Sequence, residues 1–303
     1  MANDSDVYIP NVEAKLICDE QLVQHISLHT GQHKQEDVTR TEILDFGNEG
    51  FLLKNVLSRE ECQYYIQETE PLYEEMSGVK KSYRNNTRVL INNEDLSKLI
   101  FLRVKPFLDK ITVDGDPHKI HIHGIEPLLQ GTWKPVGLNP TWRFCKYTPG
   151  GHFAPHFDGH FVENSRLRSL KTFMLYLNGD FKGGTTNFVD EQQTLFKDDI
   201  GRYRAEEKNI LTRIQPEEGL AIVFNHHRLH EGSPVMNGEK YIMRTDVMYE
   251  KQGDEVVDQN MEKAISMVQE AERLEARGDN MAAMELYRKA FKISPSVAKY
   301  YGN

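Results

Sequence analysis

The sequence predicts an α+β protein in which a β-rich centre lies between two helical regions. Three observations lead to this fold class. Apolar residues recur at helical spacing between residues 58 and 111, short strand-like runs fill residues 142–249, and helical spacing returns after residue 258. Many short strands separated by Gly and Pro are typical of a β-sandwich or barrel. We therefore expect N-terminal supporting helices, a β core and a C-terminal helical hairpin.

The N-terminal part is predicted to hold a flexible segment, a strand-like run and two helices. Residues 1–40 are polar and weakly periodic, and order should begin in EILDFGNEGFLLKNVLS. Ser58 and Glu61 form a Ser-x-x-Glu capping box that opens the first helix, over ECQYYIQETEPLYEEM. The second helix is predicted over residues 93–111. Its apolar stripe consists of Leu96, Leu99, Ile100, Val104 and Leu108.

The centre of the chain is predicted to form strands joined by tight turns. The runs TFMLYLN, LAIVFN and KYIMRTDVMY are β-rich, and the segments YTPGG, FKGGTTN and QPEEG carry turn residues. Gly183 and Gly184 permit the tight turn that FKGGTTN requires.

One pair of residues in this centre suggests a metal site. In PHFDGH, His156 and Asp158 would point to the same face of a strand, because side chains alternate along it. A third ligand is available downstream in FNHHRLHEGSPV, where His230 is our choice over His226 and His227. Two histidines and one carboxylate are the facial triad of non-haem Fe(II) oxygenases, and the same set also suits Zn²⁺. His152 and His160 flank the first motif and should lie at the mouth of the site, whereas the pair His121 and His123 has no evident carboxylate partner.

The order of motifs over residues 142–250 resembles the 2-oxoglutarate- and Fe(II)-dependent dioxygenases, and most closely their prolyl 4-hydroxylase branch. RFCKYTPGGHFAPHFD is similar to the loop that leads into the family's His-x-Asp. TFMLYLN followed by FKGGTTNF is similar to its strand pair ending in a Gly-Gly-Thr turn. IQPEEGLAIVFNHHRLHEGSPVMNGEKY is similar to its closing segment, in which a basic residue follows the distal His by ten positions. The resemblance implies a double-stranded β-helix, or jelly roll, as the catalytic core.

The resemblance also implies a role for each motif residue. His156, Asp158 and His230 would be the catalytic Fe(II) ligands, and 2-oxoglutarate and O2 would take the remaining metal positions. Lys240 matches the family's basic anchor for the distal carboxylate of 2-oxoglutarate. Arg244, four residues along the same strand face, would share that carboxylate or replace Lys240 as its anchor. Further candidates at the cosubstrate pocket are Tyr147, Tyr176 and Thr172, where the alternative for the tyrosines is plain core packing.

From this resemblance we expect a dioxygenase domain over residues 41–253 that uses Fe(II), 2-oxoglutarate and O2, with ascorbate as a candidate cofactor. The expected substrate is a prolyl residue of an intracellular protein. Another protein side chain, a free amino acid or a nucleic-acid base stays open, as does a noncatalytic scaffold, because substrate choice resides in loops outside the motifs.

The C-terminal segment, residues 258–303, resembles a single tetratricopeptide-like helical hairpin that ends at a proline. The matching positions are Ala271, Leu274, Gly278, Ala283, Tyr287, Ala290 and Pro295. One repeat cannot bury its own apolar face. The hairpin should therefore either pack on the dioxygenase domain or dock a protein partner.

Composition limits the compartment and the partners. The chain has 303 residues and a net charge of −9, which argues against a broad nucleic-acid-binding face. Its three cysteines, Cys18, Cys62 and Cys145, form no disulfide pattern and suit a reducing compartment. No secretory signal or membrane-spanning apolar run is evident. We expect a cytoplasmic or nuclear protein that acts on a protein or peptide.

Overall fold

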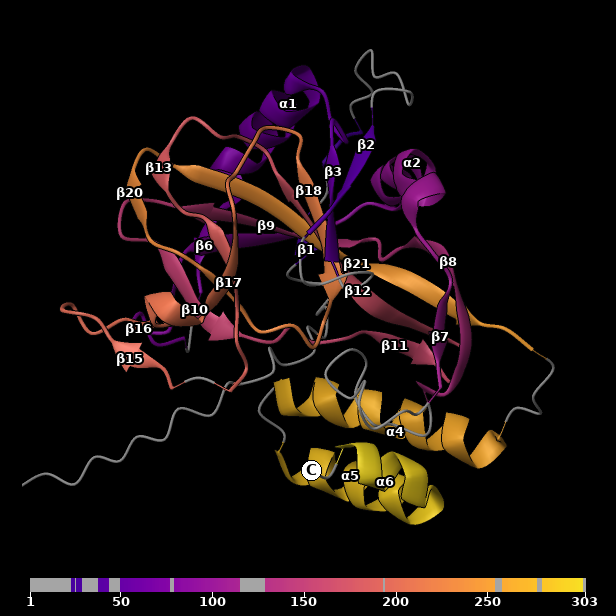
Figure 1. Cartoon of the computed structure of the whole chain (residues 1–303). Coiled ribbons are helices and arrows are strands. Elements are labelled where there is room, and N and C mark those ends of the chain that lie inside the picture. Colours follow the sequence, from indigo (N-terminus) through magenta and orange to yellow (C-terminus); the bar gives the residue numbers. More distant parts are fainter. Residues whose placement is uncertain are drawn as a thin grey trace, which may run out of the picture.

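The computed structural model describes most of the chain and shows a β core with helices on two sides (Figure 1). The described residues are 23–24, 26–28, 38–43, 50–76, 79–114, 129–192, 194–253, 258–276 and 280–301. Cys18, His121 and His123 lie outside these residues.

The larger sheet forms one wall of the core. Its strands run in the order β1 (Val23–Gln24), β6 (Thr87–Asn92), β9 (Thr141–Tyr147), β21 (Lys240–Lys251), β12 (Leu167–Tyr176), β18 (Ala221–Asn225), β3 (Gly50–Lys54) and β2 (Thr39–Glu42). The strands that branch from this path are β4 (Glu74–Glu75), β7 (Ile111–Val113), β8 (Gly131–Leu138) and β11 (Val162–Asn164). The long strand β21 pairs with β12 along one edge and with β9 and then β8 along the other.

A smaller sheet faces it. Its strands run in the order β17 (Ile210–Ile214), β14 (Thr186–Val189), β19 (His230–Gly232), β10 (His152–His156) and β5 (Arg84–Asn85). Two antiparallel strand pairs form separate small sheets, β13 (Lys182–Gly183) with β20 (Val235–Asn237) and the hairpin of β15 (Phe196–Lys197) with β16 (Tyr203–Arg204). An apolar cluster fills the space between the sheets, with Phe153 and Phe188 from the smaller sheet and Met174, Phe224 and Ile242 from the larger one. This is the double-stranded β-helix that the sequence predicted, within an α+β fold.

Two helices support the outer face of the larger sheet. The helix α1 (Arg59–Thr69) begins at the predicted capping box, in which the Glu61 amide donates to Ser58 Oγ at 3.2 Å. Buried residues of α1 and α2 (Glu94–Val104) share an apolar cluster with the sheet. The two helices are joined by a buried ion pair between Arg103 and Glu61, at 2.7 Å.

The second helix is shorter than predicted. Instead of continuing to residue 111, α2 gives way to the 3₁₀ turn η5 (Lys105–Phe107), and strand β7 begins at Ile111. Pro106 explains this end, because proline removes a backbone donor and clashes with the preceding helical turn. The first helix likewise ends in a 3₁₀ turn, η4 (Glu70–Leu72), which contains Pro71.

The predicted flexible segment contains ordered strand pairs. Strand β1 runs parallel to β6, and β2, which begins at Thr39, pairs with β3. Residues 1–22 lie outside the described residues.

The C-terminal region is helical, with one helix more than predicted. The helices α4 (Gln259–Ala276) and α5 (Asn280–Ile293) pack against each other, and α6 (Pro295–Tyr301) follows. Pro295 thus starts a helix rather than stopping one, because its fixed φ suits the first helical position. None of the described helices is long and apolar enough to span a bilayer.

The first of these helices contacts the β core. Val162 of β11 belongs to an apolar cluster with Ala264, Ile265 and Val268 of α4, and the Ser165 amide donates to Glu262 at 3.1 Å. In Figure 1, α4 accordingly lies between β11 and the other two C-terminal helices. The C-terminal region therefore packs on the core through α4.

Candidate metal centre and cosubstrate pocket

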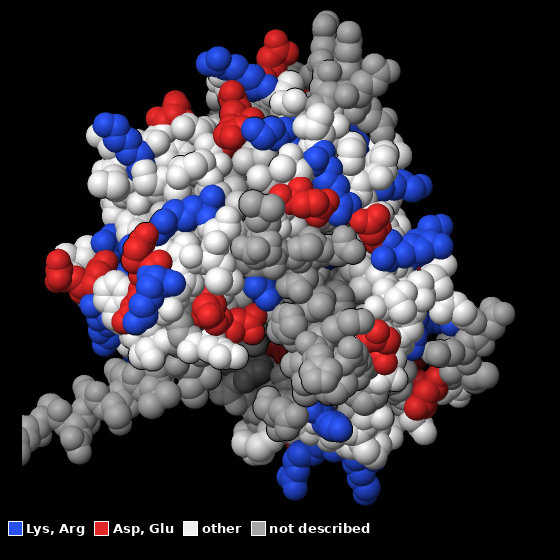
Figure 2. All heavy atoms as spheres, in the orientation of Figure 1, with Lys and Arg blue, Asp and Glu red and all other residues white. Residues whose placement is uncertain are grey.

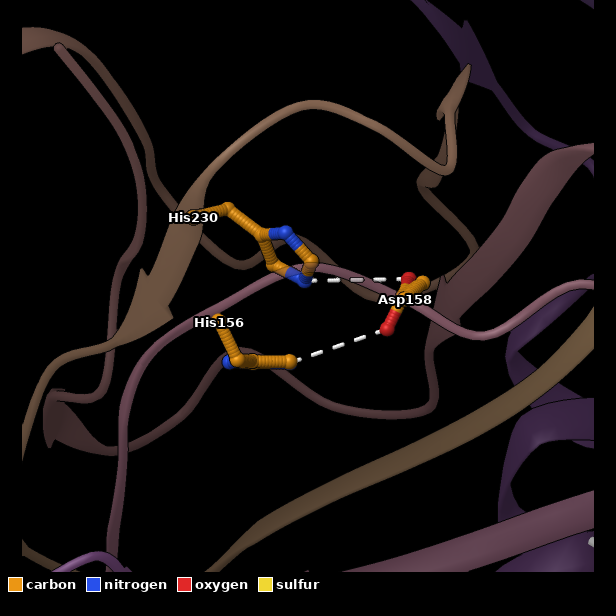
Figure 3. A group of neighbouring side chains, drawn as sticks. All are labelled: His156, Asp158 and His230. Carbon is orange, nitrogen blue, oxygen red and sulfur yellow. Dashed lines mark ion pairs between the residues drawn. The ribbon is translucent and has the colours of Figure 1, made fainter. Parts of the chain in front are cut away.

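The structure brings His156, Asp158 and His230 together, although His230 lies 72 positions after Asp158 in the sequence (Figure 3). His156 ends β10 and His230 begins β19, and the two are directly paired in the antiparallel register of these strands. Their Nε2 atoms lie 3.6 Å from Asp158 Oδ1 and 3.7 Å from Asp158 Oδ2, respectively. One potential ligand atom from each residue lies within 4.8 Å of the others, and all three side chains are buried.

Asp158 reaches this position from a loop and not from a strand. Strand β10 ends at His156, so the prediction that alternation along one strand orients both side chains was wrong for Asp158. Its backbone amide instead donates to the carbonyl of His226, at 3.1 Å. That contact ties the backbone of Asp158 to the segment that follows β18.

Both histidine rings are oriented by backbone carbonyls. His156 Nδ1 lies 2.7 Å from the Ala154 carbonyl oxygen, and His230 Nδ1 lies 2.9 Å from that of Arg228. A carbonyl oxygen can only accept, so each Nδ1 must carry the proton. Each Nε2 then carries a lone pair, which is the tautomer that a metal-binding imidazole requires.

The Asp158 carboxylate also fits a cation. Thr172 donates to Oδ2 at 2.6 Å, and the Arg244 guanidinium forms an ion pair with Oδ1 at 2.7 Å. Among the described residues, no aligned hydrogen bond reaches the buried Oδ1. A carboxylate offers about four lone-pair sites. Both oxygens therefore retain acceptor capacity, and the donor set of two imidazoles and one carboxylate fits Fe(II).

His226 and His227, the alternatives to His230 as the third metal ligand, lie outside the ligand group. His226 lies with Nε2 2.9 Å from Ser169 Oγ and Nδ1 3.0 Å from Thr172 Oγ1, and burial lowers its pKa well below the usual range. Burial also lowers the pKa of His227. Neither belongs to the group of ligand atoms around Asp158.

His152 is buried in β10 with its ring against the Ser82 and Gly150 carbonyls, so the expectation that it lies at the mouth was wrong. The side chain is held inside the smaller sheet, where β10 pairs with β5 and β19.

Lys240 lies in an aromatic enclosure at the other end of the site. Its Nζ donates to the Gly184 carbonyl at 2.7 Å and lies 5.4 Å and 5.3 Å from the ring centroids of Tyr147 and Tyr176. Burial of the side chain lowers its pKa to about 7. Gly184 has φ +66°, and a Cβ there would lie 3.2 Å from Lys240 Cδ, so the turn and the close approach both favour glycine.

One pocket connects Lys240 to the three ligands, and it holds about 480 Å³ including its opening. Predicted residues in its lining are Tyr147, His156, Asp158, His230, Lys240 and Arg244. Tyr176 and Thr172 lie behind this lining, where the Tyr176 hydroxyl donates to Thr186 at 2.6 Å and Thr172 contacts Asp158. Thr172 was expected to line the pocket, and its hydroxyl instead supports a lining residue.

The lining also contains residues that sequence reasoning missed. They are Arg84, Arg143, Cys145, Phe153, Met174, Thr186, Glu231, Gly232 and Ile242. Alternation along β9 from Tyr147 could have identified Cys145 and Arg143, which share its face. No local pattern identifies Arg84, because its position depends on the pairing of β5 with β10.

Stacking and ion pairs stabilise the walls of this pocket. The Phe153 ring lies on the His156 imidazole at 3.5 Å between centroids, and the Arg84 guanidinium lies 4.2 Å from the centroid of Phe153. Glu231, next to His230, is fully buried and pairs with Arg204 of β16 at 3.0 Å. The ligand-bearing strands are thus braced from both sides.

Comparison with known proteins finds a family similar to the part of the chain that holds this site. Residues 142–245, about a third of the chain, match the 2OG-Fe(II) oxygenase superfamily. No curated protein matches the chain.

Among solved structures, similar ones include a viral collagen prolyl hydroxylase from Paramecium Bursaria Chlorella virus-1 in complex with 2OG, with 20% identity, TM-score 0.41, and coverage of 68% of this chain and 99% of that one. A Pseudomonas putida prolyl-4-hydroxylase has 15% identity, TM-score 0.41, and coverage of 69% and 96%. A prolyl hydroxylase from Trichoplax adhaerens, in complex with a hypoxia inducible factor peptide fragment, has 13% identity, TM-score 0.40, and coverage of 67% and 84%.

The matched segment begins in β9, contains all three ligand candidates and Lys240, and ends in β21. The cofactors of this family are Fe(II), 2-oxoglutarate and O2, and the donor set described above fits the metal among them. Residues 142–245 of this chain are therefore similar to the 2OG-Fe(II) oxygenase superfamily.

Proposed function

We propose that this protein is an active Fe(II)- and 2-oxoglutarate-dependent dioxygenase that hydroxylates a prolyl residue of a protein. The observation that carries the proposal is the arrangement of one pocket, with three buried metal-ligand candidates at one end and a buried lysine at the other. A molecule with two carboxylates and a 2-keto group suits both ends at once, because one end offers a metal and the other a cation.

The residues at the two ends of the pocket would have different roles. His156, Asp158 and His230 would hold Fe(II), which supplies, together with 2-oxoglutarate and O2, the oxidising chemistry that inserts oxygen into a C–H bond and releases succinate and CO2. Lys240 would bind the distal carboxylate of 2-oxoglutarate by a charge-assisted hydrogen bond. The rings of Tyr147 and Tyr176 shield Lys240 from water, which strengthens its attraction to that carboxylate.

The prolyl substrate is supported by the motif order of residues 142–250, which is similar to that of prolyl 4-hydroxylases. Charge supports a protein substrate over a nucleic acid. The net charge is −9, and on the face drawn in Figure 2 Lys and Arg side chains are interspersed with Asp and Glu side chains. A strongly basic surface would be expected for binding a phosphate backbone.

The test measures 2-oxoglutarate consumption by the full chain with Fe(II), in the presence of proline-containing peptides and of matched peptides with alanine in place of proline. We expect succinate formation to rise with the proline peptides only, and mass spectrometry to find products heavier by one oxygen atom. Consumption of 2-oxoglutarate without any oxidised peptide would contradict the prolyl assignment. The proposal that the protein is a 2-oxoglutarate-dependent oxygenase would then still stand. Absence of consumption under all conditions would contradict the enzyme.

A further inference from the structure

The starting observation is that each oxygen of Asp158 has its own partner from the larger sheet. Thr172 of β12 donates to Oδ2 at 2.6 Å, and Arg244 of β21 lies against Oδ1 at 2.7 Å. Thr172 and the Asp158 side chain are fully buried, and the Arg244 side chain is 8% exposed. These contacts join a ligand on a loop of the smaller sheet to two adjacent strands of the larger one.

Arg244 differs from Lys240 in what it contacts, although both point to the same face of β21. Lys240 meets a carbonyl oxygen and two tyrosine rings, whereas Arg244 pairs with a metal-ligand candidate. Their backbone positions are about 13 Å apart, at roughly 3.3 Å per residue. The two basic residues therefore serve opposite ends of the pocket.

We propose that Arg244 is a positioning residue of the metal centre, acting with Thr172 on the plane of the Asp158 carboxylate, and not an anchor of the distal carboxylate of 2-oxoglutarate. The terminal torsion of an aspartate has a broad energy profile, so a carboxylate on a loop is not oriented by its own rotamer. A partner on each oxygen limits that rotation. This inference deepens the proposed function and rests on it, because it requires Asp158 to bind the metal.

The second partner, Thr172, is itself fixed by a chain of hydrogen bonds. Its one proton goes to Asp158, so it must accept from His226 Nδ1 at 3.0 Å. The Nε2 atom of His226 then accepts from the Ser169 hydroxyl at 2.9 Å, whose oxygen accepts from the Phe161 amide at 2.7 Å. The donor and the acceptor of every hydrogen bond in this series are thus determined. The arrangement assigns His226 a supporting role behind the ligand.

The experiment compares two variants of β21 by binding, without turnover. Mn(II) affinity of the full chain, and 2-oxoglutarate affinity of the Mn(II)-saturated protein, are measured by calorimetry for the wild type, Arg244→Leu and Lys240→Leu. Loss of an outer partner of a metal ligand costs roughly 10- to 100-fold in metal affinity. We expect Arg244→Leu to weaken Mn(II) binding by at least about tenfold and to leave 2-oxoglutarate affinity at saturating Mn(II) near the wild-type value. Lys240→Leu should do the reverse.

Several results would overturn the inference. Weaker 2-oxoglutarate binding with unchanged Mn(II) affinity in Arg244→Leu would make Arg244 an anchor. Unchanged or tighter Mn(II) binding would mean that loss of charge repulsion outweighs any loss of positioning. A wild-type protein that binds no Mn(II) would instead refute the proposed function on which the inference rests.

Conservative variants keep the test decisive if Arg244→Leu does not fold. Arg244→Lys retains the cation and should bind Mn(II) more weakly than the wild type but more tightly than the leucine variant. Thr172→Val, which removes the hydroxyl at nearly constant volume, should weaken Mn(II) binding, and Thr172→Ser should restore it. Equal Mn(II) affinity in the wild type, Arg244→Lys and Thr172→Val would contradict the inference.

Discussion

The two ends of the pocket differ in the sheets that form them and in the charge that is buried there. At the metal end, strands of the smaller sheet carry the histidines, and the anionic ligand Asp158 is matched by Arg244 and Thr172. At the other end, the larger sheet holds Lys240 in an enclosure of one carbonyl and two tyrosine rings. The metal end is arranged around a ligand set, and the lysine end presents a buried cation. If the proposed function is correct, the charge that balances Lys240 comes from the distal carboxylate of 2-oxoglutarate.

The largest effect is expected at the metal end. Substituting His156, Asp158 or His230 by alanine should abolish 2-oxoglutarate decarboxylation. The loss should exceed the roughly 100-fold that is expected when a residue that only contacts a metal ligand is removed. Circular dichroism should show a folded protein in each case. His227→Ala, outside the ligand group, is the matched control and should retain turnover. Activity that survives His230→Ala but not His226→Ala would show that His226, and not His230, is the third ligand. Turnover restored by Zn(II) instead of Fe(II) would contradict the assignment as an oxygenase.

A smaller effect is expected at the lysine end. Lys240→Ala should raise the KM for 2-oxoglutarate by at least about tenfold, or about 1.4 kcal/mol, because a charge-assisted contact is lost. Arg244→Ala should raise this KM less at saturating Fe(II). Steady-state kinetics with each variant measures both values. The reverse order of effects would transfer the anchor from Lys240 to Arg244.

Burial of Lys240 is expected to make the affinity for 2-oxoglutarate depend on pH. Its pKa is lowered from 10.5 to about 7, so at higher pH the lysine is neutral and must take up a proton to pair with a carboxylate. We expect 2-oxoglutarate affinity to be constant below about pH 7 and to fall by up to roughly tenfold per pH unit above it. Calorimetry in buffers of different ionisation enthalpy would detect the proton uptake. A wild-type profile identical to that of Lys240→Arg, which stays charged, would exclude this linkage.

The same pKa shift affects stability with a definite sign. The ammonium is less favourable in the folded protein than in the unfolded chain, so the folded state binds fewer protons between about pH 7 and 10.5. The buried ammonium of Lys240 therefore lowers the free energy of unfolding by its full amount below about pH 7. This loss of stability becomes smaller as the pH rises from about 7 to 10.5.

The smallest effect on turnover is expected far from both ends. Removing residues after Gly253 uncovers Val162, whose burial against α4 is worth about 1.5–3 kcal/mol. We expect a lower melting temperature with unchanged decarboxylation, since α4 contacts β11 and not the pocket lining. Thermal unfolding and turnover of the truncated protein test this. Aggregation would mean that the C-terminal helices are part of the core, and an unchanged melting temperature would mean that the α4 contact contributes little.

The sequence predicted best where local chemistry decides the outcome. The capping box at Ser58 and Glu61 defines the start of α1, because both partners lie within one helical turn. The positive φ values of Gly183 and Gly184 follow from a turn that other residues adopt only with strain. Alternation also held for Lys240 and Arg244, which share a face because β21 is continuous between them.

Other features depended on contacts between distant segments. Alternation failed for Asp158 because β10 ends before it, and a backbone hydrogen bond to His226 fixes its position in the loop. The assignment of partners to Arg244 and Thr172 needed the packing of two sheets, since both side chains could equally have faced the cosubstrate. Arg84 entered the pocket only through the pairing of β5 with β10.

By itself, the sequence determined the residue types of the site, their order along the chain and the strands that carry most of them. The strands follow from periodicity, which acts over a few residues, and the site residues follow from the resemblance of the motif order to that of the dioxygenases. The tertiary structure alone decided that His156 and His230 are paired across two strands, that Thr172 and Arg244 both contact Asp158, and that Lys240 is buried between two rings. The physical reason is that the geometry of a metal ligand and the pKa of a lysine depend on desolvation and on partners from other strands, and the chain acquires both only when its two sheets close on each other.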